Sequence, residues 1–337
     1  MSRIAIIGAG AWGTGLATIL ARKGTHDVRL WAYEPEVREA IAVHHMNAQF
    51  LPGQRIPESV SAAKDLQEAL RDAEIVVSVM PSQHCRKLML AARPFLNVDM
   101  LIVSATKGLE EKSLSRMTEV ITEVVASGGG FEARVGALSG PSFAVEAARG
   151  DPTALTIASQ DGRLAETIQR EFSDPRFRVY TNNDVIGVEL GGALKNVIAI
   201  AAGICHGLGL EHNSIAALIT RGLAEMTRLV IACGGKMETM SGLAGLGDLV
   251  LTCTGGLSRN RSVGVELGRG RKLPEIIAGM HGSVAEGVFT THAAVGLARS
   301  RGVEMPITEQ MYAILQDHKP PSQAIDELKT RSAKREN

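Results

Sequence analysis

A single lysine, Lys195, stands in an otherwise uncharged stretch, residues 190–204. A helix this apolar belongs in a protein interior, where burial of an unpaired ammonium lowers its pKa by up to ~3–5 units. A lysine tuned in this way is a suitable general acid near neutral pH. The neighbouring Asn196 offers a neutral donor and acceptor for a substrate oxygen. The alternative is a lysine that extends to the surface at the rim of the helix.

Two polar groups further along the chain complete this candidate centre. Asp248 lies among uncharged residues and is a natural counter-charge for Lys195. Residues 255–261 place two guanidinium groups at an expected helix start, which suits a phosphate through charge-assisted hydrogen bonds and the helix dipole. We favour Arg259 over Arg261 as the phosphate ligand, because Arg261 is expected on the solvated first turn. Ordinary surface charges are the alternative for both.

A G-x-G-x-x-G pattern near the start of the chain indicates a nucleotide site. It follows an expected strand and opens an expected helix. In that setting Gly8 permits the tight turn, Gly10 lets the backbone approach a diphosphate, and Gly13 allows close packing of helix on sheet. The amides near Ala11 and Trp12 then face the diphosphate at the positive end of the helix dipole.

The choice between NAD and NADP stays open. Glu34 comes just after the second expected strand, where an acid suits the ribose 2′-hydroxyl of NAD and repels a 2′-phosphate. No basic residue stands at position 32 or 33, although Arg38 could reach in from the next helix. Glu34 as the start of a solvated helix is an equally good interpretation, so NAD is favoured only slightly.

Two further segments end expected strands at the edge where ligands of such sheets bind. Lys107 follows residues 104–106, and a surface lysine is as good an interpretation as a ligand contact. Residues 140–144 follow the next strand and are mostly small, which would let a ligand approach the backbone.

Short apolar runs alternate with helical stretches up to about residue 184, which indicates a parallel sheet covered on both faces. The expected strands are 3–7, 28–32, 75–80, 100–104, 135–139, 154–158 and 178–181. The expected helices of this half are 12–22, 35–44, 65–71, 83–95, 113–125 and 163–172. A loop is expected at 44–57, with turns at 128–130 and 283–287.

After residue 184 only helices are expected, at 185–206, 214–233, 261–268, 273–280, 290–301 and 306–315. The predicted fold class is therefore α/β, an N-terminal Rossmann-like doubly wound sheet followed by an all-helical C-terminal domain. Residues 1–187 would bind the dinucleotide and residues 188–337 the substrate. The tail after Pro320 is expected to fray.

Composition narrows the class of protein. The 337 residues suffice for two domains, and 45% hydrophobic with 21% charged residues is typical of a globular protein. Thirty-six basic residues balance thirty-six acidic ones, which argues against nucleic acid or an anionic membrane as partner. The cysteines form no CxxC pair and the histidines, such as His281, no HxxxH pair, so we expect reduced thiols and no metal. The apolar run before Gly8 is too short for a signal core or a membrane span, so we expect a cytoplasmic protein without one.

Taken in order, these motifs resemble the NAD(P)-dependent glycerol-3-phosphate dehydrogenases, most closely the bacterial soluble type. The resemblance covers nearly the whole chain and rests on Gly8–Gly13, Phe50-Leu51-Pro52-Gly53, Ser104-Ala105-Thr106-Lys107-Gly108, Leu138-Ser139-Gly140-Pro141-Ser142, Leu194-Lys195-Asn196, Gly247-Asp248-Leu249, Ser258-Arg259-Asn260-Arg261 and Glu286-Gly287. It implies that Lys195 is the proton donor, held by Asp248, with Lys107 beside the reacting groups.

The resemblance also implies binding residues. With the three glycines of the turn, contacts to the NAD or NADP cofactor would come from Ala11, Trp12, Tyr33, Lys107, Ala144, Arg259, Val284 and Glu286. Contacts to the substrate would come from Lys107, Gly140, Ser142, Lys195, Asp248, Ser258, Arg259 and Asn260, with Asn196 and Thr252 as neighbours.

The implied reaction moves a hydride between the nicotinamide and C2 of dihydroxyacetone phosphate, and its product, sn-glycerol 3-phosphate, feeds glycerophospholipid synthesis. Many bacterial relatives carry a basic residue where this chain has Ala32-Tyr33-Glu34, so strict NADPH preference is not implied. Two alternatives remain: a related dehydrogenase for a β-hydroxy acid or sugar acid, and a dinucleotide sensor without turnover. The helical half also suggests a homodimer.

Overall fold

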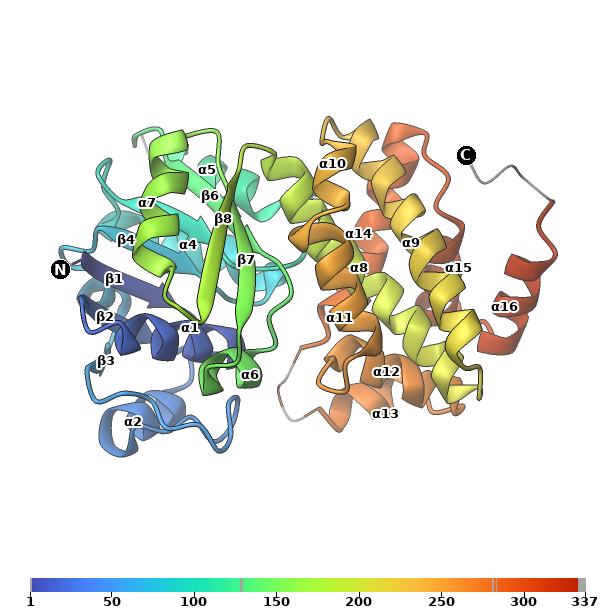
Figure 1. The fold of residues 1–337 in the computed structure, drawn as a ribbon, viewed down its shortest axis with the longest axis horizontal. Coiled ribbons are helices and arrows are strands. Elements are labelled where there is room, and N and C mark those ends of the chain that lie inside the picture. Colours follow the sequence, from blue (N-terminus) through green and yellow to red (C-terminus); the bar gives the residue numbers. More distant parts are fainter. Residues whose placement is uncertain (1, 128–129, 281, 283, 333–337) are drawn as a thin grey trace.

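The computed structural model of the chain describes residues 2–127, 130–280, 282 and 284–332. Figure 1 shows a half built on a sheet beside a half built of helices. Three expectations lie wholly or partly outside the described residues: the turn at 128–130, His281, and the start of the turn at 283–287.

Eight strands form one sheet in the order β3-β2-β1-β4-β5-β6-β7-β8. They are β1 (Ser2–Ile7), β2 (His26–Trp31), β3 (Val60–Ala62), β4 (Ile75–Ser78), β5 (Leu101–Ser104), β6 (Arg134–Ser139), β7 (Thr153–Ala158) and β8 (Phe177–Asn182). Seven of these were expected from the sequence. β3 was not, because three residues after a long loop are too few to show an alternating pattern.

One pair of neighbours departs from the expected parallel sheet: β6 and β7 are antiparallel. The only helix between them is α6 (Ala144–Arg149), which was also not expected. Six helical residues span about 9 Å, too little to carry the chain back along the sheet. The chain therefore stays at the edge where β6 ends, and β7 runs in the opposite direction.

Helices cover both faces of the sheet, which confirms the doubly wound arrangement. One face packs against α1 (Ala11–Arg22), α2 (Pro35–His44), α6 and α7 (Gly162–Phe172). The other packs against α3 (Leu66–Leu70), α4 (Cys85–Ala92) and α5 (Met117–Ala126), while short 3₁₀ turns η1 (Ser82–His84) and η2 (Arg93–Phe95) flank α4.

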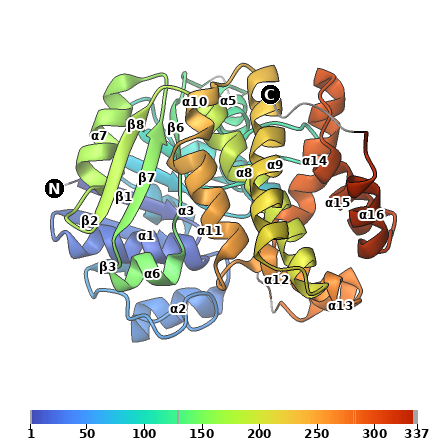
Figure 2. The same ribbon diagram turned by 45° about the vertical axis from the view of Figure 1, so that its right-hand side comes forward.

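The second half contains only helices in its described residues, as expected. They are α8 (Val185–Gly207), α9 (His212–Ala232), α10 (Met237–Met240), the π-helical turn η3 (Leu243–Gly247), α11 (Asp248–Thr254), α12 (Arg259–Gly268), α13 (Leu273–Ala278), α14 (Glu286–Arg301), α15 (Pro306–Gln316) and α16 (Pro321–Lys329). Figure 2 shows α15 and α16 on the side of this half that is turned away from the sheet.

α8 is the central helix of the second half. Its apolar side chains pack with those of the surrounding helices, and it also contacts β6 of the sheet. By length and hydropathy α8 could cross a membrane, but 89% of the relevant window is buried inside the protein, as in the core helix of a folded domain. The expected domain limit at 187/188 falls in its first turn and stays a prediction.

Three helices of this half were missed by the sequence analysis. α10 and α11 are short and follow glycines, which conceal helical periodicity. α16 contradicts the expected fraying after Pro320: Pro321 occupies its first turn, where proline is well tolerated, and Ala324 is buried against the core.

Candidate active site

The turn after β1 is shaped for the backbone to approach a ligand. Gly8 has φ +117°, and a Cβ there would stand 2.4 Å from the Val79 carbonyl oxygen. A Cβ on Gly13 would stand 1.9 Å from the Gly8 carbonyl oxygen, so helix and turn touch only because both residues are glycine. A Cβ on Gly10, in contrast, would meet no atom within 4 Å. Gly8 and Gly13 are therefore required for the close packing of the turn, whereas Gly10 leaves space beside the backbone for a ligand.

This turn fits the diphosphate of a dinucleotide. No side chain caps the N-terminus of α1, so its first amides keep their capacity to donate. The indole Nε1 of Trp12 is buried and has no hydrogen-bond partner among the described residues, although its ring packs 6.5 Å from that of Phe177. An anion at this helix start would meet unused donors and the positive end of the dipole.

Asn47 supports the turn and was missed by the sequence analysis. Its buried Nδ2 donates to the Ala9 carbonyl oxygen and to the Thr14 hydroxyl, each at 2.8 Å. Its Oδ1 accepts from the Phe50 amide at 3.2 Å. The loop expected at 44–57 thus acts as a brace for the glycine turn, which no local pattern in a loop could reveal.

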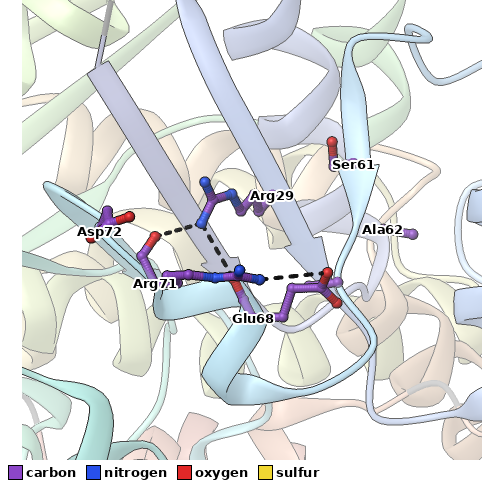
Figure 3. Close-up of a pocket in the computed structure, with 7 residues that line it drawn as sticks. Arg29, Ser61, Ala62, Glu68, Arg71 and Asp72 are labelled. Atoms are coloured by element: carbon purple, nitrogen blue, oxygen red, sulfur yellow. Dashed lines mark hydrogen bonds and ion pairs between the residues drawn. The ribbon is translucent and has the colours of Figure 1, made fainter.

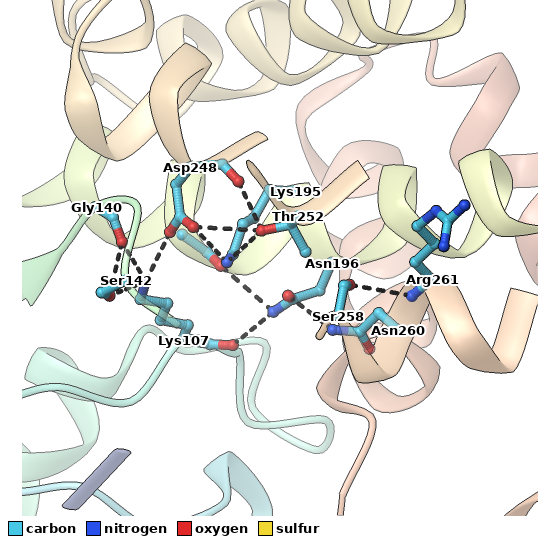
Figure 4. Close-up of polar contacts among 11 residues, drawn as sticks. Lys107, Gly140, Ser142, Lys195, Asn196, Asp248, Thr252, Ser258, Asn260 and Arg261 are labelled. Atoms are coloured by element: carbon cyan, nitrogen blue, oxygen red, sulfur yellow. Dashed lines mark hydrogen bonds and ion pairs between the residues drawn. The ribbon is translucent and has the colours of Figure 1, made fainter. Parts of the chain in front are cut away.

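The predicted meeting of Lys195 and Asp248 is present in the structure, and Lys107 joins them (Figure 4). The Lys195 Nζ donates to Asp248 Oδ1 at 2.6 Å, and the Lys107 Nζ donates to Asp248 Oδ2 at 2.7 Å. Lys107 also donates to the Gly140 carbonyl oxygen at 2.7 Å and lies 3.5 Å from the Ser142 hydroxyl. One carboxylate therefore holds two ammonium groups, one from each half of the molecule.

The Lys195 ammonium has one N–H that the protein does not use. Two of its three donors go to Asp248 and to the Thr252 hydroxyl, the latter at 2.8 Å. The third has no partner among the described residues. Lys195 is only 7% exposed, which excludes the alternative of a lysine extended into solvent.

Burial sets the protonation of this centre. It lowers the pKa of Lys195 to about 8, against the opposing attraction of Asp248 and with a further lowering by Lys107. Burial disfavours the Asp248 carboxylate, but the two ammonium groups outweigh that effect and hold its pKa below the ordinary value. The centre is thus an ionised carboxylate beside a lysine that can release its proton close to neutral pH.

The π-helical turn η3 places Asp248 against α8. A Cβ on Gly191, one turn before Lys195, would stand 2.7 Å from the Ala244 carbonyl oxygen of this turn. Only glycine at 191 lets the turn lie this close, and α11 then begins with Asp248 facing Lys195. The small residue at 191 therefore lets a second element approach Lys195 closely.

Asn196 and Asn260 do not point unused amides into the site. The Asn196 Nδ2 donates to the Lys107 carbonyl oxygen at 3.0 Å, and its Oδ1 accepts from Asn260 Nδ2 at 2.9 Å. The Asn260 Oδ1 in turn accepts from the Gly287 amide. These amides connect the Lys107 loop, α8, α12 and the start of α14, so Asn196 is mainly committed to the protein rather than to a ligand oxygen.

The two arginines at the start of α12 differ in their surroundings. Arg259 is accessible to solvent and forms no hydrogen bond or ion pair with the described residues, yet burial lowers its pKa while Glu286 opposes that effect. This combination is typical of a cation on the wall of a cleft. The Arg261 guanidinium points away from the Lys195 cluster in Figure 4. Ser258 caps the helix by accepting from the Arg261 amide at 3.2 Å.

The remaining predicted contact residues lie around the glycine turn and at the start of α14. Tyr33 follows β2 and is 63% exposed. Ala144 begins α6, where it faces Gly15 of α1. Glu286 begins α14, two residues after Val284. Its carboxylate accepts a hydrogen bond from the hydroxyl of Ser82, which follows β4 of the sheet. None of these four bonds directly to the Lys195 cluster among the described residues.

A pocket of about 330 Å³ lies elsewhere, between β2, β3 and α3 (Figure 3). Its walls include Arg29, Glu68 and Arg71, and no residue proposed for the site. The Arg29 guanidinium is already bonded to the Asp27 carboxylate and to the Glu68 and Arg71 carbonyl oxygens. None of its lining residues is a buried polar side chain that lacks a hydrogen-bond partner among the described residues.

A Rossmann-like sheet with an open glycine turn, joined to a helical half whose buried lysine meets the sheet half at Lys107, defines a dinucleotide-dependent dehydrogenase. Family models narrow the class: the NAD-dependent glycerol-3-phosphate dehydrogenase N-terminus matches residues 3–165 and the C-terminus matches residues 184–326. The chain belongs to this family, as the sequence resemblance predicted.

Individual proteins agree over the full length. The chain is 66% identical over 331 residues to a glycerol-3-phosphate dehydrogenase (NAD(P)+) of Koribacter versatilis, covering 98% of each chain. It is 54% identical over 339 residues to the protein of the same name from Acidobacterium capsulatum, covering 100% of each. The crystal structure of glycerol-3-phosphate dehydrogenase from Coxiella burnetii superposes with a TM-score of 0.92 at 42% identity, over 98% of this chain and 99% of that one.

Proposed function

We propose that this protein interconverts dihydroxyacetone phosphate and sn-glycerol 3-phosphate with NAD or NADP, and that Lys195 moves the proton. The observation that carries the proposal is the buried Lys195 ammonium, which is held by Asp248 and Thr252 and keeps one N–H without a partner among the described residues. Such a group can act as a general acid toward an oxygen atom of a bound substrate.

The glycine turn would hold the cofactor. The backbone amides at the start of α1, near Ala11 and Trp12, would face the diphosphate, since the turn is open at Gly10. Tyr33, Ala144, Val284 and Glu286 are proposed as further contacts. When bound, the dinucleotide supplies or accepts the hydride at C4 of its nicotinamide.

Lys195 would donate its proton to the developing C2 alkoxide during reduction and, as the neutral amine, would take it back during oxidation. Asp248 keeps the amine protonated near neutral pH, because its charge opposes the effect of burial. Lys107 would lie beside the substrate and balance the second oxygen of Asp248. Gly140 and Ser142, which follow the neighbouring strand β6, hold the Lys107 ammonium from within the same half.

The phosphate would bind away from the reacting carbon, at the start of α12. Arg259 presents an unpaired guanidinium there, and the helix dipole adds positive potential. Ser258 and Asn260 flank it. Binding energy from this remote group would orient the ketone against the nicotinamide, a contribution of several kcal/mol.

Three broader proposals accompany the reaction. The substrate is a small molecule, and its product would feed glycerophospholipid synthesis. The protein would act in the cytoplasm as a homodimer. Cell fractionation tests the cytoplasmic location and light scattering tests the homodimer, both independently of catalysis.

The experiment follows nicotinamide absorbance with purified protein, with NADH or NADPH, and with or without dihydroxyacetone phosphate. Oxidation that depends on the phosphorylated ketone is the expected result. Binding of either cofactor with no turnover on this ketone would overturn the proposal, and turnover on β-hydroxy or sugar acids would replace its substrate. The ratio of kcat/KM with the two cofactors decides the preference that Glu34 leaves open.

A further inference from the structure

Ser82, which no comparison or sequence motif pointed to, joins the two halves of the molecule. It lies just after β4, is fully buried, and binds the Glu286 carboxylate at the start of α14 with two donors. The Ser82 amide donates to Oε1 at 2.9 Å and the Ser82 hydroxyl donates to Oε2 at 2.6 Å. The two residues are 204 positions apart in the chain.

The same serine is tied to the loop that carries Lys107. The Gln83 Nε2 donates to the Ser82 hydroxyl at 3.0 Å and to the Leu109 carbonyl oxygen at 2.7 Å, and the Gln83 Oε1 accepts from the Glu111 amide at 3.0 Å. Gly108 lies directly over the pair, because a Cβ there would stand 2.7 Å from both Glu286 Oε2 and the Ser82 hydroxyl.

We infer that Ser82 is a positioning residue for the reaction: it clamps Glu286 of the helical half and thereby fixes the start of α14 and the Lys107 loop relative to the glycine turn. The inference rests on the proposed dinucleotide site. Both donors of Ser82 are directed at one carboxylate, so loss of the hydroxyl leaves one carboxylate oxygen without its short hydrogen bond.

The clamp also governs the charge of Glu286. Burial raises the pKa of this carboxyl, while the Ser82 hydroxyl, the Ser82 amide and the nearby Arg259 guanidinium all lower it. Removal of the hydroxyl therefore raises the pKa of Glu286 further. The carboxylate then takes up a proton at a higher pH than in the parent protein, and its electrostatic attraction for the nearby Arg259 guanidinium is lost earlier as the pH falls.

Ser82→Ala tests this role, with Ser104→Ala as the matched control. Ser104 is also a buried serine at the end of a strand of the sheet, but its hydroxyl has no hydrogen-bond partner among the described residues. NADH binding, followed by its fluorescence over a range of pH, is the main readout because it needs no turnover. The KM for the ketone and kcat are measured separately.

We expect Ser82→Ala to weaken NADH binding roughly fivefold or more, as loss of a hydrogen bond to a charged group does, and to steepen the weakening as the pH falls. Ser104→Ala should match the parent. Equal behaviour of the two variants at every pH would overturn the inference, whereas a parent protein that binds NADH but reduces no ketone would instead overturn the proposed function.

Glu286→Gln supplies a second test, and it stands alone if Ser82→Ala shows no cooperative thermal melt. It keeps the shape of the side chain and removes its titration, so the acid-side loss of NADH affinity should disappear. In the Glu286→Gln background, Ser82→Ala should add no pH dependence. An unchanged acid-side loss in Glu286→Gln, or an unchanged effect of Ser82→Ala in that background, would show that Ser82 does not act through this carboxylate.

Discussion

Asp248 and Glu225 are both buried carboxylates of the helical half, but their partners differ in kind. Glu225 accepts from the amides of Ile307 and Thr308 and from the Thr308 hydroxyl, all within 2.9 Å, at the start of α15. Asp248 accepts from two ammonium groups at the cleft. The donors that bind Glu225 are neutral groups committed to that carboxylate. The Lys195 ammonium, in contrast, keeps one N–H without a partner among the described residues.

Glu225 therefore stabilises the packing of two helices, whereas Asp248 positions the proposed proton donor Lys195. Around Glu225, burial raises the carboxyl pKa and the helix N-terminus opposes that effect, so the group serves as a cap that joins α9 to α15. Around Asp248, the same burial is outweighed by the positive charges of the Lys107 and Lys195 ammonium groups. Substitutions at Lys195, Asp248, Arg259 and Glu225 test this difference between the two carboxylates.

Lys195→Ala should lower kcat for reduction of dihydroxyacetone phosphate by about 10²–10⁴-fold, the usual contribution of a general acid. NADH affinity should stay near the parent value, because the glycine turn is untouched. Stopped-flow or steady-state absorbance measures the first quantity and NADH fluorescence the second. Near-normal turnover would remove Lys195 from the mechanism.

Asp248→Asn should lower reduction at neutral pH by more than about tenfold and change its pH dependence. The parent needs protonated Lys195, so reduction should fall as the pH rises through about 8, and oxidation should rise over the same range. Without the Asp248 charge, burial and Lys107 lower the Lys195 pKa further, and the fall in reduction moves to lower pH. A pH profile of kcat/KM for reduction measures this shift. If the fall in kcat/KM stayed at the same pH in Asp248→Asn, Asp248 would not be the residue that sets the pKa of Lys195.

Arg259→Ala should weaken binding of the phosphorylated ketone by about tenfold or more, since a charge-assisted contact to phosphate is lost. The comparison substrate is dihydroxyacetone, which lacks the phosphate and should lose far less. The control is Arg261→Ala, on the same helix but directed away from the cluster. Equal losses on both substrates would place Arg259 outside the phosphate site.

Glu225→Gln should destabilise the protein by about 1–3 kcal/mol and leave kcat nearly unchanged. The amide nitrogen of glutamine faces the Ile307 or Thr308 donors and leaves a buried N–H without an acceptor. Denaturant unfolding measures the loss, and activity is expressed per folded molecule. A large fall in kcat in the folded variant would erase the contrast between the two carboxylates.

Local patterns in the sequence were enough for several parts of the site. The spacing of Gly8, Gly10 and Gly13 after an apolar run predicts the turn, since each glycine answers a local steric demand. The absence of other charges around Lys195 predicts its burial. Strand and helix periodicity predicts the doubly wound sheet and the helical half, because both periods are short compared with the elements themselves.

Other parts depend on contacts between distant segments. Lys107 shares Asp248 with Lys195, Asn47 braces the glycine turn, and Ser82 binds Glu286. Each of these contacts joins segments far apart in the chain, and periodicity within one segment does not reveal its partner. The reversed direction of β7 likewise follows from how far α6 can carry the chain. Such pairings are set by the path of the chain in space.

The order of residues alone thus determined which backbone could turn tightly and which ammonium would be kept from water, because both follow from side-chain size and polarity over a few neighbouring positions. Folding in three dimensions decided how many charges share one carboxylate and which donors remain unused. Those quantities depend on distances of a few ångströms between segments far apart in the chain, and only packing fixes such distances.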